Sequence, residues 1–280
     1  MTFLLEILKE AVNVTLLVLI MMIVIDFLDV KSRGRFHKFI EDNRLRQYVA
    51  TSFLGVMPGC LGSFLNVSMY VHGFLSFGAI AAGMIATSGD EAFVMLAQFP
   101  LQALMLFGIL FVIAIPLGWL SDLAIKKLNI KTCKDCEMTE FHSVKEEKSP
   151  GHYLRAHVWN HIIKKHIWRV FLWTFFAMLI VGVGLEYWSL EGFIKENLGL
   201  VLILSVLIGI IPESGPHLVF VMLFAQGVIP FSVLLASSIS QDGHGLLPLL
   251  SYSLRDTMLI KLFNVIAALI VGGIAYGLGW

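Results

Sequence analysis

The sequence has few charged residues and few cysteines. Only 14% of its 280 residues are Asp, Glu, Lys or Arg, against roughly 25% in a typical soluble domain. The formal net charge is zero, so the composition does not support nucleic-acid binding, which depends on a basic surface. Three cysteines are too few for a disulfide framework. These shortages argue against a soluble globular domain and against a disulfide-rich secreted one.

Long hydrophobic runs are abundant instead. Hydrophobic residues make up 58% of the chain, and the mean hydropathy is +0.83. A helix of about 20 apolar residues crosses a bilayer. Four runs reach that length with their flanks, and they cover residues 12–25, 93–120, 170–185 and 259–278. We therefore expect an all-α integral membrane protein with several spans.

Two basic stretches divide the chain into parts. They cover residues 31–46 and 121–166, and positive charge marks the cytoplasmic side of a membrane protein. We expect residues 1–120 to form a first transmembrane part and residues 167–280 a second. The segment 121–166 between them is expected to be a cytoplasmic loop.

The two transmembrane parts resemble one another at a fixed offset of 154 residues. Glycine, proline and apolar positions recur at this offset, as in the pairs Gly55/Gly209, Pro58/Pro212, Gly73/Gly227, Phe77/Phe231, Ala82/Ala236 and Gly89/Gly243. The loop after the first span of each half differs in charge, with six basic residues in 31–46 and one, Lys195, in 189–197. The halves should therefore have opposite orientation, as in the inverted repeats of many secondary transporters.

Each half also contains apolar pieces that are too short to span a membrane. They cover residues 48–57, 74–86, 198–211 and 231–239, and each ends in a polar stretch rich in glycine or proline. These pieces predict broken or re-entrant half-helices. Irregular backbone at membrane depth must be buried in protein or line a wet cavity, so the breaks predict the binding site.

Four acids lie at these breaks, and no Lys or Arg lies in the same segments. A charged side chain inside a membrane is costly and usually functional, so unpaired acids imply a cation, a proton or both. Asp90 and Asp242 are expected to form the core of the site. The other candidate ligands or proton acceptors are Glu91, Glu213, His244, Ser88, Gln241, His217 and Cys60.

A simpler interpretation of the acids remains open. Asp90 or Ser88 could cap a helix running from residue 92 to 120, and Glu91 would favour the dipole of that helix. Glu213 could cap in the same way after Pro212. Residues 242–244 could form an ordinary extracellular turn.

The cytoplasmic loop holds a second candidate metal site. Cys133 and Cys136 form a C-x-x-C pair, and His157 and His161 lie one helical turn apart. These four residues predict an accessory site for Zn²⁺ or a softer metal. Alternatively, residues 152–169 form a basic amphipathic helix on the membrane surface, with its histidines as interfacial polar groups.

Two long stretches resemble the hallmark blocks of a known family. They read PGCLGSFLNVSMYVHGFLSFGAIAAGMIATSGDEAFVML and IPESGPHLVFVMLFAQGVIPFSVLLASSISQDGHGLLPLLSYS, and HVWNHIIKKHIWRVFLWTF between them is also similar. The family is one of ten-span heavy-metal exporters in bacteria and archaea, whose members carry the names arsenic efflux protein or manganese transporter. The resemblance implies a multi-pass transporter, not an enzyme, in the inner membrane of a prokaryote.

The residues favour a divalent cation over arsenic as the substrate. As(III) prefers several thiolates, and Cys60 is the only cysteine in the predicted membrane part. Carboxylate oxygens suit an ion such as Mn²⁺, so we expect export of a Mn²⁺-like ion in exchange for protons, without a resident cofactor. The expected partners are the metal ion, protons and the lipid bilayer, and a homodimer stays open.

Three other functions also stay open. An anion or lipid-linked phosphate carrier would bind its substrate at half-helix N-termini. An intramembrane metal-dependent enzyme would use Glu213 with His217 and Asp242 with His244. A metal sensor that does not transport would use the Cys/His loop.

Overall fold

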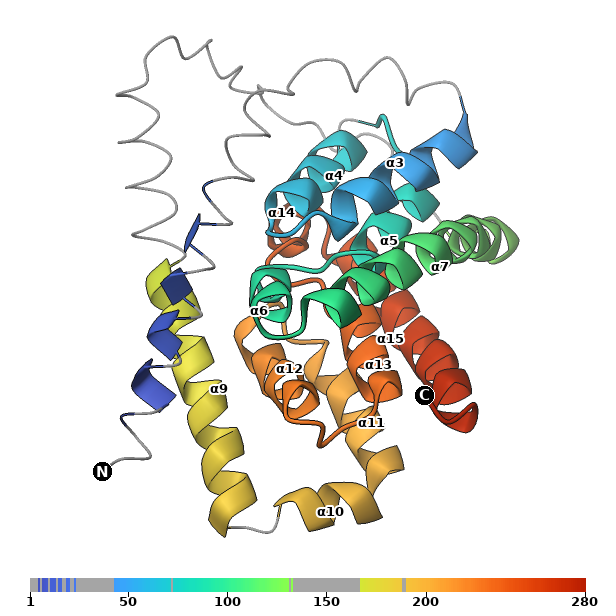
Figure 1. Ribbon diagram of the computed structural model, residues 1–280. Helices are drawn as coiled ribbons and strands as arrows, with labels where there is room; N and C mark the ends of the chain where they lie inside the picture. Colours follow the sequence, from blue (N-terminus) through green and yellow to red (C-terminus); the bar gives the residue numbers. More distant parts are fainter. Residues whose placement is uncertain are drawn as a thin grey trace, which may run out of the picture.

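The structure is a computed structural model of the whole chain. It describes residues 43–71, 73–130, 132, 167–187 and 190–280, together with part of a helix between residues 5 and 23. The described residues form helices joined by short turns, and none of them lies in a β-strand (Figure 1). The expected all-α class is confirmed.

The helices fall into two sets joined by α9 (Trp168–Tyr187) and α10 (Leu190–Glu196). The first set contains α3 (Arg44–Val56), α4 (Leu61–Val71), α5 (Phe77–Ile85), α6 (Glu91–Gln98) and α7 (Pro100–Lys127). The second set contains α11 (Leu198–Ile208), η2 (Gly215–His217), α12 (Leu218–Ala225), α13 (Phe231–Ser240), α14 (Leu247–Tyr252) and α15 (Leu254–Gly277).

The two sets correspond helix by helix at the offset seen in the sequence. Adding 154 to the first residue of α3, α5 or α7 gives the first residue of α11, α13 or α15. Two left-handed glycines recur as well: Gly73 and Gly227 have φ of 79° and 71°, and Gly89 and Gly243 have φ of 58° and 50°. The sequence repeat is therefore also a repeat of backbone conformation.

Local sequence explains where the helices break. Met57 precedes Pro58 and is extended, with ψ of 128°, because proline disfavours the helical conformation in the residue before it. The Ser76 side chain accepts a hydrogen bond from Ala79 N and so caps the start of α5. At 9 and 10 residues, α5 and α13 are too short to cross a bilayer.

One expected helix is divided in two. The run 93–120 was expected to form a single helix, but α6 ends at Gln98 and a new helix, α7, begins at Pro100. Proline has no backbone N–H to continue a helix but suits the first position of one. The expectation of an unbroken helix is therefore wrong, and α6 is a separate short helix.

Glycines bring the long and short helices of each set close together. A methyl group on Gly118 of α7 would lie 2.7 Å from Cβ of Ala82 in α5. The equivalent group on Gly272 of α15 would lie 2.5 Å from Cβ of Ala236 in α13. Between the sets, α6 packs against α12 and α14 packs against α4 (Figure 1). The short helix after the second break of each set thus contacts the other set.

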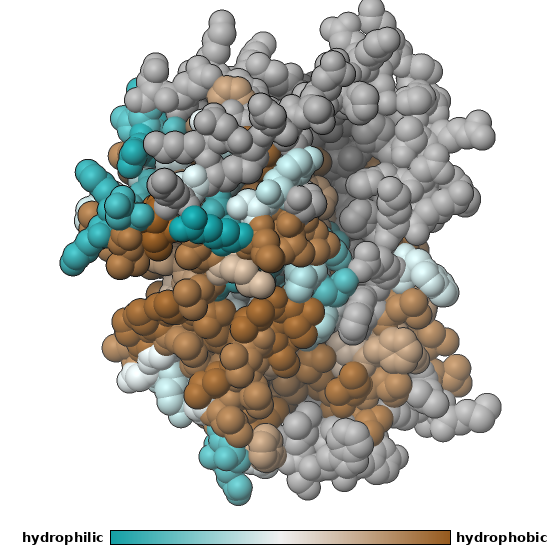
Figure 2. All heavy atoms as spheres, turned by 180° about the vertical axis from the view of Figure 1, so that it is seen from behind, coloured by the Kyte–Doolittle hydropathy of each residue, from teal (hydrophilic) through white to brown (hydrophobic). Residues whose placement is uncertain are grey.

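The outer surface is that of a membrane protein. In the described part of the chain, α7 and α15 are long and apolar enough to cross a bilayer, and only 33% and 39% of their most apolar windows are buried. One face of the molecule shows a broad hydrophobic area with hydrophilic residues gathered toward its ends (Figure 2). Soluble monomers rarely expose apolar patches of this extent, so lipid is the natural environment of these side chains.

Candidate metal site

The four breaks of the two sets meet inside the protein. Gly59 N donates to Gly89 O at 3.0 Å, which joins the two breaks of the first set. Gln241 Nε2 donates to Thr87 O at 2.8 Å, which joins the second set to the first. A methyl group on Gly243 would lie 2.9 Å from Ser214 Oγ and 3.7 Å from Gly89 Cα. Left-handed glycines at 89 and 243 therefore allow the chain segments to approach this closely.

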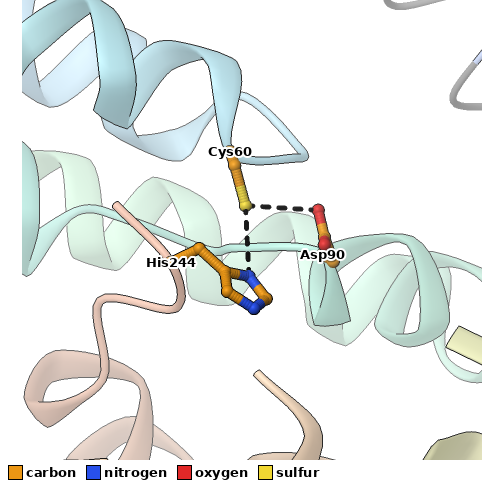
Figure 3. A group of neighbouring side chains, drawn as sticks. All are labelled: Cys60, Asp90 and His244. Atoms are coloured by element: carbon orange, nitrogen blue, oxygen red, sulfur yellow. Dashed lines mark hydrogen bonds between the residues drawn. The ribbon is translucent and has the colours of Figure 1, made fainter. Parts of the chain in front are cut away.

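Cys60, Asp90 and His244 come together at this junction (Figure 3). Cys60 Sγ lies 3.4 Å from Asp90 Oδ1 and 3.8 Å from His244 Nδ1. One ligand atom from each residue lies within 4.8 Å of the other two. Cys60 and Asp90 are buried, and His244 is partly buried. We call these three residues the Cys60 cluster.

The distances from Cys60 to the other two residues of the Cys60 cluster match the ligand spacing of a metal site. Zinc binds sulfur and nitrogen at about 2.0–2.3 Å, so ligand atoms of a tetrahedral site lie about 3.3–3.8 Å apart. The two distances from Cys60 Sγ fall in this range. Thiolate, imidazole and carboxylate together suit a borderline divalent ion such as Zn²⁺. Three protein ligands leave a fourth position open.

Glu213 lies on the far side of the imidazole ring from Cys60, at ion-pair distance but without the alignment of a hydrogen bond. Its Oε1 lies 2.9 Å from His244 Nε2, while Nδ1 of the same ring faces Cys60. In the tautomer that carries its proton on Nε2, the Nδ1 lone pair is free to bind a metal. A carboxylate behind the ring is a common way to orient a metal-binding histidine and strengthen it as a ligand.

The Cys60 cluster is built from equivalent positions of the two halves. His244 lies 154 residues after Asp90, and Ser214 lies 154 residues after Cys60. Ser214 is buried and lies at the same junction, next to Gly89 and Gly243. The cluster therefore lies where the two repeats meet, with ligands from both.

Asp90 is not used as a helix cap. It occupies the N-cap position of α6, but its side chain makes no capping hydrogen bond. Its Oδ1 is directed at Cys60 instead (Figure 3). The capping alternative therefore does not explain this acid, although Glu91 does lie in the first turn of α6 as that alternative expected.

Comparison with known proteins agrees with a metal-handling role. The sequence matches a family described as "Putative, 10TM heavy-metal exporter" over residues 3–191 and 167–278. The chain belongs to this family. The resemblance seen in its two long stretches is thereby confirmed, and the protein is a membrane protein of a metal-efflux type. No curated protein and no solved structure matches the chain.

In this member of the exporter family, one of the expected unpaired acids is paired. Lys261 Nζ lies 2.6 Å from Asp242 Oδ1 and donates to Gly209 O at 2.8 Å. Asp242 is fully buried, and Lys261 is 7% exposed. The expectation that the acids at the breaks have no basic partner is wrong for Asp242. The sequence analysis missed Lys261, although a lone lysine inside the predicted span 259–278 is a signal for a buried partner.

The other candidate residues lie around the junction with different partners. Ser88 Oγ donates to Val56 O at 3.3 Å, and His217 Nδ1 lies 3.2 Å from Ser237 Oγ. These contacts and that of Gln241 with Thr87 O connect helices and breaks to one another. Glu91 is 2% exposed and lies beside Gly89 without joining the Cys60 cluster. Cys133, Cys136, His157 and His161 lie outside the described residues.

Proposed function

We propose that the protein is a secondary-active exporter of a divalent metal cation and that the Cys60 cluster binds the cation in transit. The observation that carries this proposal is the convergence of thiol, carboxylate and imidazole from both repeats inside a member of an exporter family. A thiolate and a carboxylate supply two negative charges, which match a divalent cation. Water would fill the open fourth position. Because only three protein ligands hold the ion, it can be released again.

The position of the Cys60 cluster suits alternating access. Inverted repeats rock against one another around a site at their interface and expose it first to one side and then to the other. Two observations support such an arrangement. The helices of the two sets correspond, and each set sends one short helix, α6 or α14, into contact with the other set. We propose that the halves are inverted and that the broken segments are re-entrant. In this arrangement the loop 121–166 lies in the cytoplasm.

The donor set changes the expected ion. Mn²⁺ was expected because four unpaired acids seemed available, but Asp242 is paired with Lys261 and Glu91 lies outside the Cys60 cluster. Thiolate and imidazole favour softer ions than carboxylate alone. We therefore propose a Zn²⁺-like ion as the preferred substrate, with Mn²⁺ bound more weakly. Because Cys60 binds metal as a thiolate, metal entry releases a proton, and this supports exchange for protons.

The anion-carrier alternative receives less support from the structure. A basic residue in the membrane part of the chain would favour an anion carrier, and Lys261 is such a residue. However, Asp242 neutralises this lysine at 2.6 Å. The pair therefore offers no net positive charge to an anion, and the nearby Cys60 cluster carries an acid.

The proposal can be tested by metal binding and transport. The variants are Cys60→Ser, Asp90→Asn and His244→Gln, with Glu196→Gln and Lys127→Gln, two exposed positions that are not part of the Cys60 cluster, as controls. Each site variant should bind Zn²⁺ at least about tenfold more weakly in a chelator competition assay on purified protein. Each should also lose Zn²⁺ uptake into everted vesicles, while the controls keep both.

Cys60→Ser should also change selectivity. Loss of the thiolate should weaken Zn²⁺ binding much more than Mn²⁺ binding, because serine offers only a hard oxygen. Unchanged Zn²⁺ affinity and uptake in all three site variants, with monodisperse folded protein, would disprove the proposal. Preference of the wild type for Mn²⁺ over Zn²⁺ would disprove only the assignment of the ion.

A further inference from the structure

A groove with a volume of about 620 Å³ lies between α3 and α7, and no residue of the Cys60 cluster lines it. Its apolar lining comes mostly from α7. Two cations, Arg44 and Lys126, also line it, together with Tyr48 and Asp122. The apolar residues are Leu45, Ile115, Pro116, Trp119 and Leu123. We call this the α3–α7 groove.

The polar side of the groove is held in place by hydrogen bonds. Asp122 Oδ2 accepts from Tyr48 OH at 2.8 Å, and Oδ1 accepts from Gly78 N at 2.6 Å. Arg44 Nη1 lies 3.7 Å from Asp122 Oδ2, and the Arg44 side chain is 71% exposed. A guanidinium has five N–H donors, so Arg44 can bind a second anion without leaving Asp122. Lys126 is exposed as well.

The apolar side of the groove belongs to the lipid-facing surface. Trp119 and Leu123 are 55% and 47% exposed on a helix long enough to cross a bilayer. Tryptophan is enriched at the level of the lipid headgroups, and lysine near a helix end extends toward them. The groove thus joins an apolar region at membrane depth to two cations near the membrane surface.

We propose that the α3–α7 groove binds an anionic phospholipid. The phosphate lies between Arg44 and Lys126, and an acyl chain follows Ile115 and Trp119. Basic pockets between membrane helices are a recognised form of site for anionic headgroups. The volume suits part of one lipid, whereas a stable protein partner needs a far larger interface.

The second half of the chain provides an internal comparison. The positions 154 residues after Arg44, Asp122 and Lys126 are Leu198, Tyr276 and Trp280. The corresponding corner between α11 and α15 therefore lacks both cations and the acid. The repeat keeps the helices but not the charges, so the lipid site belongs to one half. If the halves are inverted as proposed above, it belongs to one leaflet.

The experiment measures lipid binding to the purified full chain. Native mass spectrometry and thermal shift would compare phosphatidylglycerol with phosphatidylcholine of the same acyl chains, and with inorganic phosphate. Arg44→Gln/Lys126→Gln removes both cations and keeps side-chain length. Arg255→Gln/Lys127→Gln removes one exposed arginine and one exposed lysine outside the groove, and serves as the matched control.

Wild type should bind phosphatidylglycerol more tightly than phosphatidylcholine. The Arg44/Lys126 variant should bind phosphatidylglycerol about 30-fold more weakly, because it loses two cations near a headgroup. The Arg255/Lys127 control should bind like wild type. Trp119→Ala, which leaves both cations in place, should weaken the lipid but not the binding of inorganic phosphate.

Several outcomes would overturn the proposal. One is unchanged phosphatidylglycerol binding in the Arg44/Lys126 variant. Another is an equal loss in the control pair, which would indicate general surface charge. Equal binding of phosphatidylcholine, or full competition by inorganic phosphate, would show that no anionic lipid is specifically held. Metal binding by the Cys60 cluster is measured separately, so failure here leaves the proposed function untouched.

Discussion

Lys261 donates a hydrogen bond in the second half to a carbonyl whose equivalent in the first half accepts from a backbone amide. Gly55 O accepts a hydrogen bond from Ser88 N at 3.3 Å, whereas the equivalent Gly209 O accepts from Lys261 Nζ at 2.8 Å. The lysine also neutralises Asp242, which is the residue equivalent to Ser88. One side chain therefore connects α15 to both breaks of the second half, and the charged pair has no counterpart in the first half.

Removing one partner of the Lys261–Asp242 pair should destabilise the protein much more than removing both. Lys261→Met or Asp242→Asn alone should lower the free energy of unfolding by about 3–5 kcal/mol, because each leaves a buried group without its partner. The double variant should recover most of this loss, since no buried charge remains. Thermal unfolding in detergent measures all three. The control is Lys127→Met, an exposed lysine at the end of α7, which should have little effect.

A double variant that is as unstable as the sum of the singles would contradict this interpretation. It would mean that Lys261 and Asp242 stabilise the protein through separate contacts. Lys261 has one such separate contact, its hydrogen bond to Gly209 O. Because the double variant also loses this bond, we expect its recovery of stability to be incomplete.

Glu213 should affect the metal without binding it. Glu213→Gln keeps the shape of the side chain but removes the charge that lies 2.9 Å from His244 Nε2. Loss of such a supporting carboxylate typically weakens metal binding about 10–100-fold. Zn²⁺ titration against a chelator should show a loss in this range, smaller than the loss for His244→Gln. Glu196→Gln on the exposed side of α10 should not change the affinity, and a wild-type affinity for Glu213→Gln would remove Glu213 from the site.

At the scale of helices, small residues decide how closely α7 and α15 approach their short partners. Gly118 and Gly272 occupy equivalent positions, and a methyl group on either would collide with an alanine of α5 or α13. Gly108 and Gly273 lie on the same two helices, and a methyl group on either meets no atom within 4 Å. Each helix therefore has one glycine at a close helix contact and one with open space around it.

Alanine substitutions at these glycines should therefore have opposite effects. Gly118→Ala and Gly272→Ala should lower stability by about 1–3 kcal/mol, because packed helices cannot move apart freely. Gly108→Ala and Gly273→Ala should be neutral or raise stability by up to about 1 kcal/mol, as expected of an exposed helical position. Melting temperatures of the four variants measure this. Equal effects at clashing and open positions would show that these helix contacts are looser than described.

Helix boundaries were predictable wherever proline or glycine marked them. The short helices α3, α5, α11 and α13 begin and end within four residues of their predicted bounds, because Pro58, Ser76 and Pro212 break or cap the chain locally. The division between α6 and α7 was missed although Pro100 marks it, because the apolar run continues through Phe99. Hydrophobicity alone does not show whether a long run bends.

At the scale of the whole molecule, the offset of 154 was the most informative signal. It predicted that the breaks of the two halves correspond, and the structure brings these breaks into contact. It could not predict which side chains would meet. Cys60 contacts both Asp90 and His244, and Asp242 pairs with Lys261, because the choice depends on how the breaks cross. Lys261 reaches Asp242 from a neighbouring helix, 19 positions away in the sequence.

The orientation of the two halves is the last expectation to test. In inverted repeats, the ends of equivalent helices lie on opposite sides of the membrane, so the ends of α7 and α15 should be separated by the bilayer. Basic residues cluster around the end of α7, where Lys126 and Lys127 form the last turn, and α15 has none in its last turn. The positive-inside rule therefore predicts that the end of α7 lies in the cytoplasm and, for inverted halves, that the end of α15 lies outside. In a chain with Cys60, Cys133 and Cys136 changed to serine, Lys127→Cys should react with a membrane-impermeant maleimide only after the cells are opened.

Leu278→Cys and Gly192→Cys, both at exposed positions, should react with the same maleimide in intact cells. Labelling of Lys127→Cys and Leu278→Cys from the same side would rule out inverted halves, and alternating access around the Cys60 cluster would then need another arrangement.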